Sequence, residues 1–114
     1  MSLAIAVNDE GTPAVIAVGG ELDMNTSGEL FDAAAALIDA GRRRLVLDLD
    51  QLTFCDSAGI TAFVRLTKRA GEAGGALALA RPVQIVESVL KLTGLVEVIP
   101  VFPTVEQARA ALAT

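Results

Sequence analysis

The stretch "RLVLDLDQLTFCDSAGITAFV", residues 44–64, places two apolar segments on either side of a small polar cluster. In the first segment, residues 45–49, leucines alternate with Val46 and Asp48, which is typical of a central strand. In the second segment, from about Ser57 onward, apolar residues recur at helical spacing. A strand that passes through a short polar turn into a helix is the repeating unit of α/β proteins. The stretch therefore predicts an α/β fold.

Upstream of this stretch, the chain predicts a hairpin followed by a helix. Two apolar runs, residues 2–7 and 14–20, are separated by Asn, Asp, Gly and Pro, which are typical turn residues. Thr26 and Glu29 have the spacing of a capping box, in which a hydroxyl and a carboxylate bond reciprocal backbone amides. The helix that they begin is expected to stop at Gly41.

Downstream of it, the alternation of strands and helices continues. Residues 76–80, "ALALA", predict a strand, and Pro82 suits the start of a helix that reaches about Leu92. The segment "VEVIPVF", residues 96–102, predicts a short strand at an edge of the sheet, because an internal proline cannot donate to a ladder. A last short helix is expected to follow Thr104.

The predicted order is therefore β-β-α-β-α-β-α-β-α. It indicates right-handed crossovers and a single domain over residues 1–114, since the chain contains no linker, repeat or low-complexity segment. The expected fold is a mixed, mostly parallel sheet of four to five strands with about four helices, packed mainly on one face. Loops at the carboxyl ends of the strands are the expected location of function.

Composition excludes several classes of function. The formal charge is −5, and Tyr and Trp are absent, which argues against a nucleic-acid binder. The chain has no His, so neither a Ser-His-Asp triad nor a His-ligated metal site is possible within it. A single cysteine excludes an intrachain disulfide. With no signal peptide and no apolar run near the ~20 residues that span a bilayer, we expect a soluble, cytoplasmic protein without membrane insertion.

The polar pair Asp56-Ser57 admits three interpretations: a helix cap, a nucleophile or a phosphate acceptor. The nucleophile is weakly supported, because Cys55 stands where a G-x-S-x-G elbow has its first Gly and Lys68 lies too far along the helix to act as a base. No phosphate-binding loop occurs either. We therefore expect no catalytic residues, no metal and no cofactor, while capping and phosphate acceptance both stay open.

As a phosphate acceptor, Ser57 has a suitable position. A serine in the first helical turn is reachable by a kinase, and its phosphate would face free backbone amides and the positive end of the helix dipole. Thr53 and Thr61 are the neighbouring hydroxyls, and both are weaker candidates because one lies in the approach to the helix and the other inside it. A second loop, residues 20–25, is expected at the same end of the sheet.

Three segments together resemble the STAS domain family, named for sulfate transporters and anti-sigma-factor antagonists. They are "VIAVGGELDMNTSGEL" (residues 15–30), "LVLDLDQLTFCDSAGI" (residues 45–60) and "LKLTGLVEVIPVFPTVEQARAAL" (residues 90–112), in the family's order. The sequence is most similar to the stand-alone bacterial anti-sigma-factor antagonists. In that family the regulatory serine lies in an Asp-Ser-x-Gly stretch, which implies a regulatory role for Ser57.

The resemblance implies partner switching. An antagonist of this kind binds an anti-sigma factor, often a serine kinase with a histidine-kinase-like ATPase domain, and so frees the sigma factor. Phosphorylation of the serine, here Ser57, ends that complex, and a serine phosphatase restores it. The alternative is a STAS interaction module without a phosphoswitch, such as a component of a stress-signalling complex or of lipid-transport machinery.

We predict that the partner-binding surface joins the two loops at one end of the sheet. Acidic side chains would supply charge there, and neighbouring apolar side chains would supply contact area. The predicted surface consists of Asp23, Met24, Asn25, Thr26, Asp56, Ser57, Ala58, Gly59 and Ile60.

Overall fold

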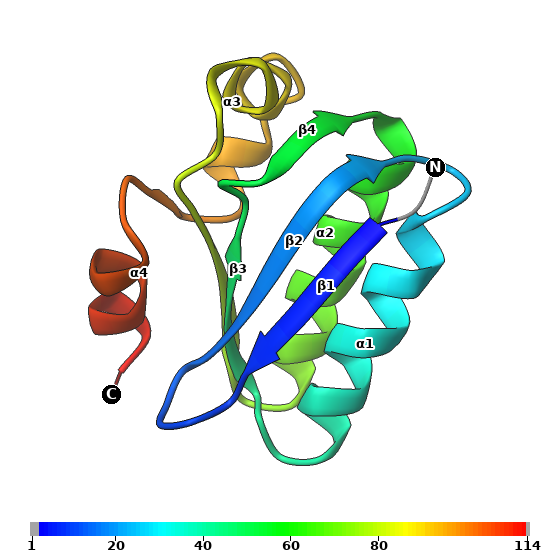
Figure 1. The fold of residues 1–114 in the computed structure, drawn as a ribbon. Coiled ribbons are helices and arrows are strands. Elements are labelled where there is room, and N and C mark those ends of the chain that lie inside the picture. The colour runs from blue at the N-terminus through cyan, green and yellow to red at the C-terminus, as the bar shows by residue number, and fades with distance from the viewer. Residues whose placement is uncertain (1–2, 114) are drawn as a thin grey trace.

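The computed structural model describes residues 3–113 and shows strands alternating with helices (Figure 1). One short 3-10 helix, η1, occurs besides the α-helices. The elements in chain order are β1 (Leu3–Asn8), β2 (Ala14–Leu22), α1 (Ser27–Asp39), β3 (Arg44–Asp48), β4 (Leu52–Cys55), α2 (Ser57–Glu72), β5 (Ala76–Ala80), α3 (Gln84–Leu92), η1 (Leu95–Glu97), β6 (Val101–Phe102) and α4 (Val105–Leu112).

The sheet is mixed, and its strands follow the order β1-β2-β3-β5-β6, with β4 pairing with β2 beside this path. Only the β1–β2 pair among the described strands is antiparallel, as the predicted hairpin requires. The strands β3 and β5 pair in parallel, with Leu45 opposite Leu77 and Leu47 opposite Leu79. The predicted α/β class with a mostly parallel sheet and four helices is confirmed, and the described part of the sheet contains six strands.

The additional strand is β4, whose residues were expected to lie in the loop before the Ser57 helix. Its four residues do not alternate: Leu52 and Cys55 are buried, whereas Thr53 and Phe54 are exposed. The strand β4 forms because β2 has nine residues and only the first part of β2 pairs with β3. The carboxyl-terminal part of β2 is left for β4, which pairs with residues 20–22.

Helices cover the two faces of the sheet unequally. Figure 1 shows α1 and α2 side by side on one face, where they close the larger core, and α4 on the opposite side. The smaller core under α4 is built on Val46, Ala78 and Ala80. The prediction that packing is mainly on one face agrees with this arrangement.

The predicted strand over residues 96–102 is wrong for most of its length. Gly94 adopts a left-handed conformation, with a φ of 77°, and the chain then forms the 3-10 helix η1. Leu95 and Ile99 are buried four residues apart, which is helical spacing rather than the alternation of a strand. Only Val101–Phe102 pairs with β5, at the edge of the sheet as predicted.

Candidate functional site

The two loops of interest lie side by side because β2 and β4 are neighbours in the sheet. Leu22 pairs with Cys55 at the ends of these strands, and the backbone N–H of Asp56 donates to the carbonyl of Leu22 at 3.1 Å. The turn after β2 and the turn after β4 therefore begin at the same level of the sheet. This confirms that both loops lie at its carboxyl-terminal end.

The turn after β4 consists of Asp56 and the first residues of α2. Asp56 is the N-cap, and its Oδ1 accepts from the backbone N–H groups of Ala58 at 2.9 Å and Gly59 at 3.2 Å. Ser57 follows as the first helical residue, and its side chain is exposed. Within residues 3–113, the Ser57 hydroxyl makes no hydrogen bond. The capping interpretation is thus correct for Asp56, and the hydroxyl of Ser57 is left unused.

The cap corrects one expectation about a phosphate on Ser57. The helix start was expected to offer free backbone amides, but those of Ala58 and Gly59 already donate to the Asp56 carboxylate. A phosphate on Ser57 would have to share or compete for these donors. It would also lie next to the negative charge of Asp56.

The neighbouring hydroxyls are both committed to the backbone. Thr53 donates from Oγ1 to the carbonyl of Gly20 at 3.0 Å, which ties β4 to β2. Thr61 donates to the carbonyl of Ser57 at 3.0 Å, within the helix. Ser57 is therefore the one exposed hydroxyl of these three that is not occupied by a backbone acceptor in the described chain.

The turn after β2 is organised differently from the capping box predicted for it. Thr26 is only 2% exposed, and its hydroxyl donates to the carbonyl of Glu21 at 2.8 Å and accepts from the N–H of Asp23 at 2.9 Å. It makes no capping bond to α1, so the predicted Thr26–Glu29 box is wrong. Asp23 shapes the turn instead, since its Oδ1 accepts from the N–H groups of Asn25 and Thr26.

The predicted surface residues divide into an exposed group and a supporting group. Met24 is 78% exposed, and Asn25 and Ser57 are also exposed. The partly exposed residues are Asp23, Asp56, Ala58 and Ile60. Thr26 and Gly59 are buried, so they support the loops from inside and offer no accessible surface to a partner.

Gly59 and Cys55 show how tightly the Ser57 turn is packed. A Cβ atom on Gly59 would lie 2.7 Å from the Cys55 sulfur and 2.9 Å from the Leu22 side chain. Burial, together with the nearby Asp56 carboxylate, raises the pKa of the Cys55 thiol to about 12. Cys55 is consequently a neutral, buried side chain at neutral pH, and it packs beneath the turn.

A groove of about 310 Å³ runs between the first turns of α1 and α2, next to Ser57. Its walls include Phe31 from α1 and Arg65 from α2, and the Arg65 guanidinium lies 4.1 Å from the centre of the Phe31 ring. Neither residue is predicted from the sequence as part of the site. The sequence indicates such a contact only weakly, because an aromatic residue and a cation on two different helices meet only after the helices pack.

Residues 3–113 contain no group of three or more His, Cys, Asp or Glu side chains arranged to hold a metal ion. Over the same residues, the longest helices are too short or too polar to cross a bilayer.

Comparisons with known proteins agree with this architecture. The profile of the STAS domain family matches residues 4–108. BtrV of Bordetella bronchiseptica, which carries the provisional name of an anti-sigma factor antagonist, is 32% identical over 95 residues, covering 83% of this chain and 82% of BtrV. The crystal structure of an anti-sigma factor antagonist from Mycobacterium paratuberculosis superimposes with a TM-score of 0.88 at 26% identity, covering 98% of this chain and 95% of that one.

A third similarity extends to SpoIIAA, which has been solved in two chemical states. The unphosphorylated form superimposes with a TM-score of 0.78 at 22% identity, covering 92% of both chains. The phosphorylated form, from Bacillus, gives 0.69 at 20% identity, covering 95% of this chain and 98% of that one. At these identities the similarity concerns the fold alone. Because the family profile spans nearly the whole sequence, the chain belongs to the STAS domain family.

Proposed function

We propose that this protein is an anti-sigma-factor antagonist whose complex with an anti-sigma factor is ended by phosphorylation of Ser57. The unphosphorylated chain binds the anti-sigma factor and thereby releases a sigma factor. The anti-sigma factor is a serine kinase of the histidine-kinase-like ATPase type, and a serine phosphatase restores the unmodified chain. The domain acts through binding and catalyses no reaction of its own.

One observation carries the proposal: the Ser57 hydroxyl is exposed and makes no hydrogen bond in the described chain, at the capped start of α2. The neighbouring hydroxyls of Thr53 and Thr61 are bonded to backbone carbonyls, and Thr26 is buried. A kinase needs an accessible hydroxyl whose modification the fold tolerates. The exposure of Ser57 supports the first requirement, and its place at the surface behind the Asp56 cap supports the second.

The electrostatics explain why a phosphate would end binding. A phosphoserine adds about −1.5 to −2 charges at neutral pH. Because Asp56 occupies the amides of Ala58 and Gly59, the phosphate stays at the surface beside a carboxylate. A partner that fits the unmodified turn would then have to desolvate a dianion. Coupling between regulatory sites is typically 1–3 kcal/mol, or roughly 5–150-fold in affinity.

The test combines site mapping with affinity measurement. The protein is incubated with its cognate anti-sigma kinase and ATP, the modified residue is identified by mass spectrometry, and the affinity for the kinase is measured by calorimetry before and after modification. We expect phosphate on Ser57 and a loss of affinity of at least about fivefold. Ser57→Ala should bind constitutively, and Ser57→Asp should reproduce part of the loss.

Thr61→Val is the matched control, because it removes the next hydroxyl along the same helix. It should be phosphorylated and should bind like the unaltered protein. Phosphate found at Thr53 or Thr61 instead of Ser57 would contradict the proposal. Tight binding to a partner that is not an anti-sigma factor, unaffected by Ser57 modification, would favour the alternative of an interaction module without a phosphoswitch.

A further inference from the structure

Arg81 has an unusual backbone and an unusual set of partners. Its φ is +42°, the one positive value at a non-glycine residue among residues 3–113. L-residues adopt this left-handed conformation at an energetic cost, so it persists where surrounding contacts enforce it. Arg81 follows the last residue of β5, and its backbone N–H donates to the carbonyl of Phe102 at 2.8 Å.

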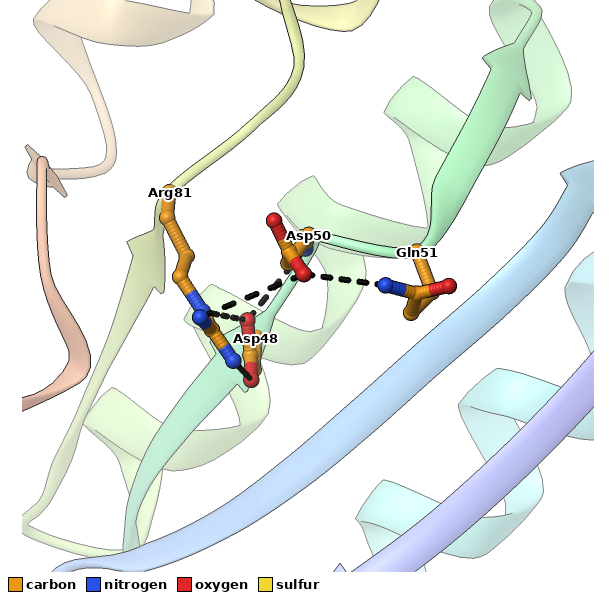
Figure 2. Close-up of polar contacts among 4 residues, drawn as sticks. All are labelled: Asp48, Asp50, Gln51 and Arg81. Atoms are coloured by element: carbon orange, nitrogen blue, oxygen red, sulfur yellow. Dashed lines mark hydrogen bonds and ion pairs between the residues drawn. The ribbon is translucent and has the colours of Figure 1, made fainter.

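The guanidinium of Arg81 is hydrogen-bonded to the end of β3 (Figure 2). Its Nε and Nη2 donate to the two carboxylate oxygens of Asp48 at 2.8 and 2.9 Å, which is a bidentate pair. Its Nη1 lies 3.9 Å from Oδ2 of Asp50. Burial alone would raise the pKa of Asp48, but hydrogen bonds from Arg81 and from the backbone of Asp50 outweigh it and hold the pKa below its usual value.

The two carboxylates belong to the bend that carries the chain from β3 to β4. Asp48 also accepts from the backbone N–H of Asp50 at 3.2 Å, and Asp50 accepts from the Gln51 side chain at 2.9 Å. The carbonyl of Gln51 in turn accepts from the N–H of Gly20 on β2 at 3.0 Å. Arg81 thus contacts two residues of this segment, Asp48 at the end of β3 and Asp50 in the bend, while the Gln51 carbonyl connects the bend to β2.

This bend determines where Ser57 is presented. The strand β4 has only four residues, pairs with β2 beside the main path of the sheet and leads directly to the Asp56 cap. Its pairing with β2 and the Thr53 bond to Gly20 hold it on one side, and the bend that precedes it sets where it begins. A shift of the bend would be transmitted over four residues to the turn that carries Ser57.

We propose that Arg81 is a positioning residue for the Ser57 site, because its bidentate grip on Asp48 and its approach to Asp50 set the geometry of the bend from which β4 and the Ser57 turn extend. This inference rests on the proposed function for its effect on partner binding. Its effect on the placement of β4 is independent of any partner.

The chain offers a matched control in a second arginine–aspartate pair. Arg69 of α2 donates to both carboxylate oxygens of Asp39 in α1, at 3.3 and 2.6 Å, between residues 30 apart in sequence. That pair joins the far ends of two helices that are also held by the main core. Removing it tests the loss of a bidentate surface pair without touching the bend.

The experiment compares Arg81→Gln, Arg81→Gly and Arg69→Gln in the full chain. Arg81→Gly is the sharpest variant, because glycine suits the left-handed backbone while the guanidinium is lost. Amide hydrogen exchange is followed at Asp56, Ala58 and Gly59, and affinity for the anti-sigma factor is measured by calorimetry. We expect both Arg81 variants to accelerate exchange at these amides by about tenfold, with amides in the middle of α1 unchanged.

Partner affinity should fall by about fivefold in both Arg81 variants. In Arg69→Gln, the exchange rates at the turn and the partner affinity should both stay within about twofold of those of the unaltered protein. Arg81→Lys should lose less partner affinity than Arg81→Gln but should still bind more weakly than the unaltered protein, since lysine cannot form the bidentate pair. The inference is overturned if Arg81→Gly leaves exchange at the turn unchanged, or if exchange rises equally across the whole chain. If exchange changes locally but the unaltered protein binds no anti-sigma factor, the proposed function fails and the positioning role of Arg81 stands.

Discussion

The turns after β2 and β4 share their chemistry but differ in what they leave accessible. In each turn, one aspartate oxygen accepts from two backbone N–H groups: Asp23 from Asn25 and Thr26, and Asp56 from Ala58 and Gly59. In the first turn the hydroxyl is buried and bonded within the loop.

In the second turn the hydroxyl, that of Ser57, is exposed and makes no hydrogen bond within the described residues. The difference shows that two turns built around an aspartate in the same way can leave their hydroxyls in opposite surroundings. What distinguishes the two turns is whether the fold already uses the hydroxyl.

The largest expected difference between the turns is in their tolerance of a methyl group. Gly59→Ala should destabilise the fold by about 1–3 kcal/mol, because the new Cβ would overlap Cys55 and Leu22. Gly28→Ala, at the start of α1, meets nothing within 4 Å and should be neutral or stabilising by less than about 1 kcal/mol. Urea denaturation of both variants measures the change in unfolding free energy. Equal midpoints would show that the two positions tolerate a methyl group equally well.

The second difference concerns the hydroxyls themselves. Thr26→Val should cost about 1–2 kcal/mol of unfolding free energy, because the carbonyl of Glu21 and the N–H of Asp23 lose their partner. Ser57→Ala should stay within about 0.5 kcal/mol of the unaltered protein, as an exposed side chain without partners predicts. The same denaturation assay separates them. A destabilised Ser57→Ala variant would reveal a structural role for that hydroxyl.

A third prediction tests what the turns have in common. Asp56→Ala should destabilise the fold by about 1 kcal/mol through loss of the α2 cap, and Asp56→Asn should lose less because the amide oxygen can still accept. Asp23→Ala should behave similarly, since Asp23 accepts the same number of N–H groups. Thermal unfolding at neutral pH provides the measurement. A much larger loss at one aspartate would show that the two are not equivalent.

The smallest effect is a pH dependence confined to the Ser57 turn. Because the pKa of Cys55 is raised in the folded protein, the unfolded chain loses this proton first as the pH increases. The stability that comes from keeping this thiol protonated is fully present below the pKa of the unfolded thiol, which is near 9. At pH 9 the loss of unfolding free energy should amount to less than about 1 kcal/mol. Cys55→Ala should have a flatter stability profile between pH 8 and pH 10. Parallel profiles would indicate that the thiol is not effectively buried.

Sequence patterns predict the parts of this fold that depend on local rules. The alternation in residues 45–49 identifies the central strand, and the Asp56-Ser57 pair identifies a strand-to-helix junction with a cap. These features follow from hydrophobic periodicity and from side chain-to-backbone bonds between near neighbours. The α/β class is therefore readable without coordinates.

The remaining features depend on contacts between distant segments. The strand β4 forms because β2 extends beyond its pairing with β3, and Thr26 turns inward because the carbonyl of Glu21 is within reach. The Arg81–Asp48 pair joins residues 33 apart in sequence. Periodicity contains no information about such distances, so neither the contacts of Arg81 with the bend nor the burial of Thr26 could be predicted.

The division of β2 between two partner strands gives its two halves different tasks. Residues 14–17 pair with β3 inside the main sheet, whereas residues 20–22 pair with β4, and the register shifts between Gly20 and Glu21. The first half of β2 therefore helps to hold the sheet together, and its last three residues set the level at which the serine leaves the sheet. One strand thus acts both as a structural beam and as the ruler for the site.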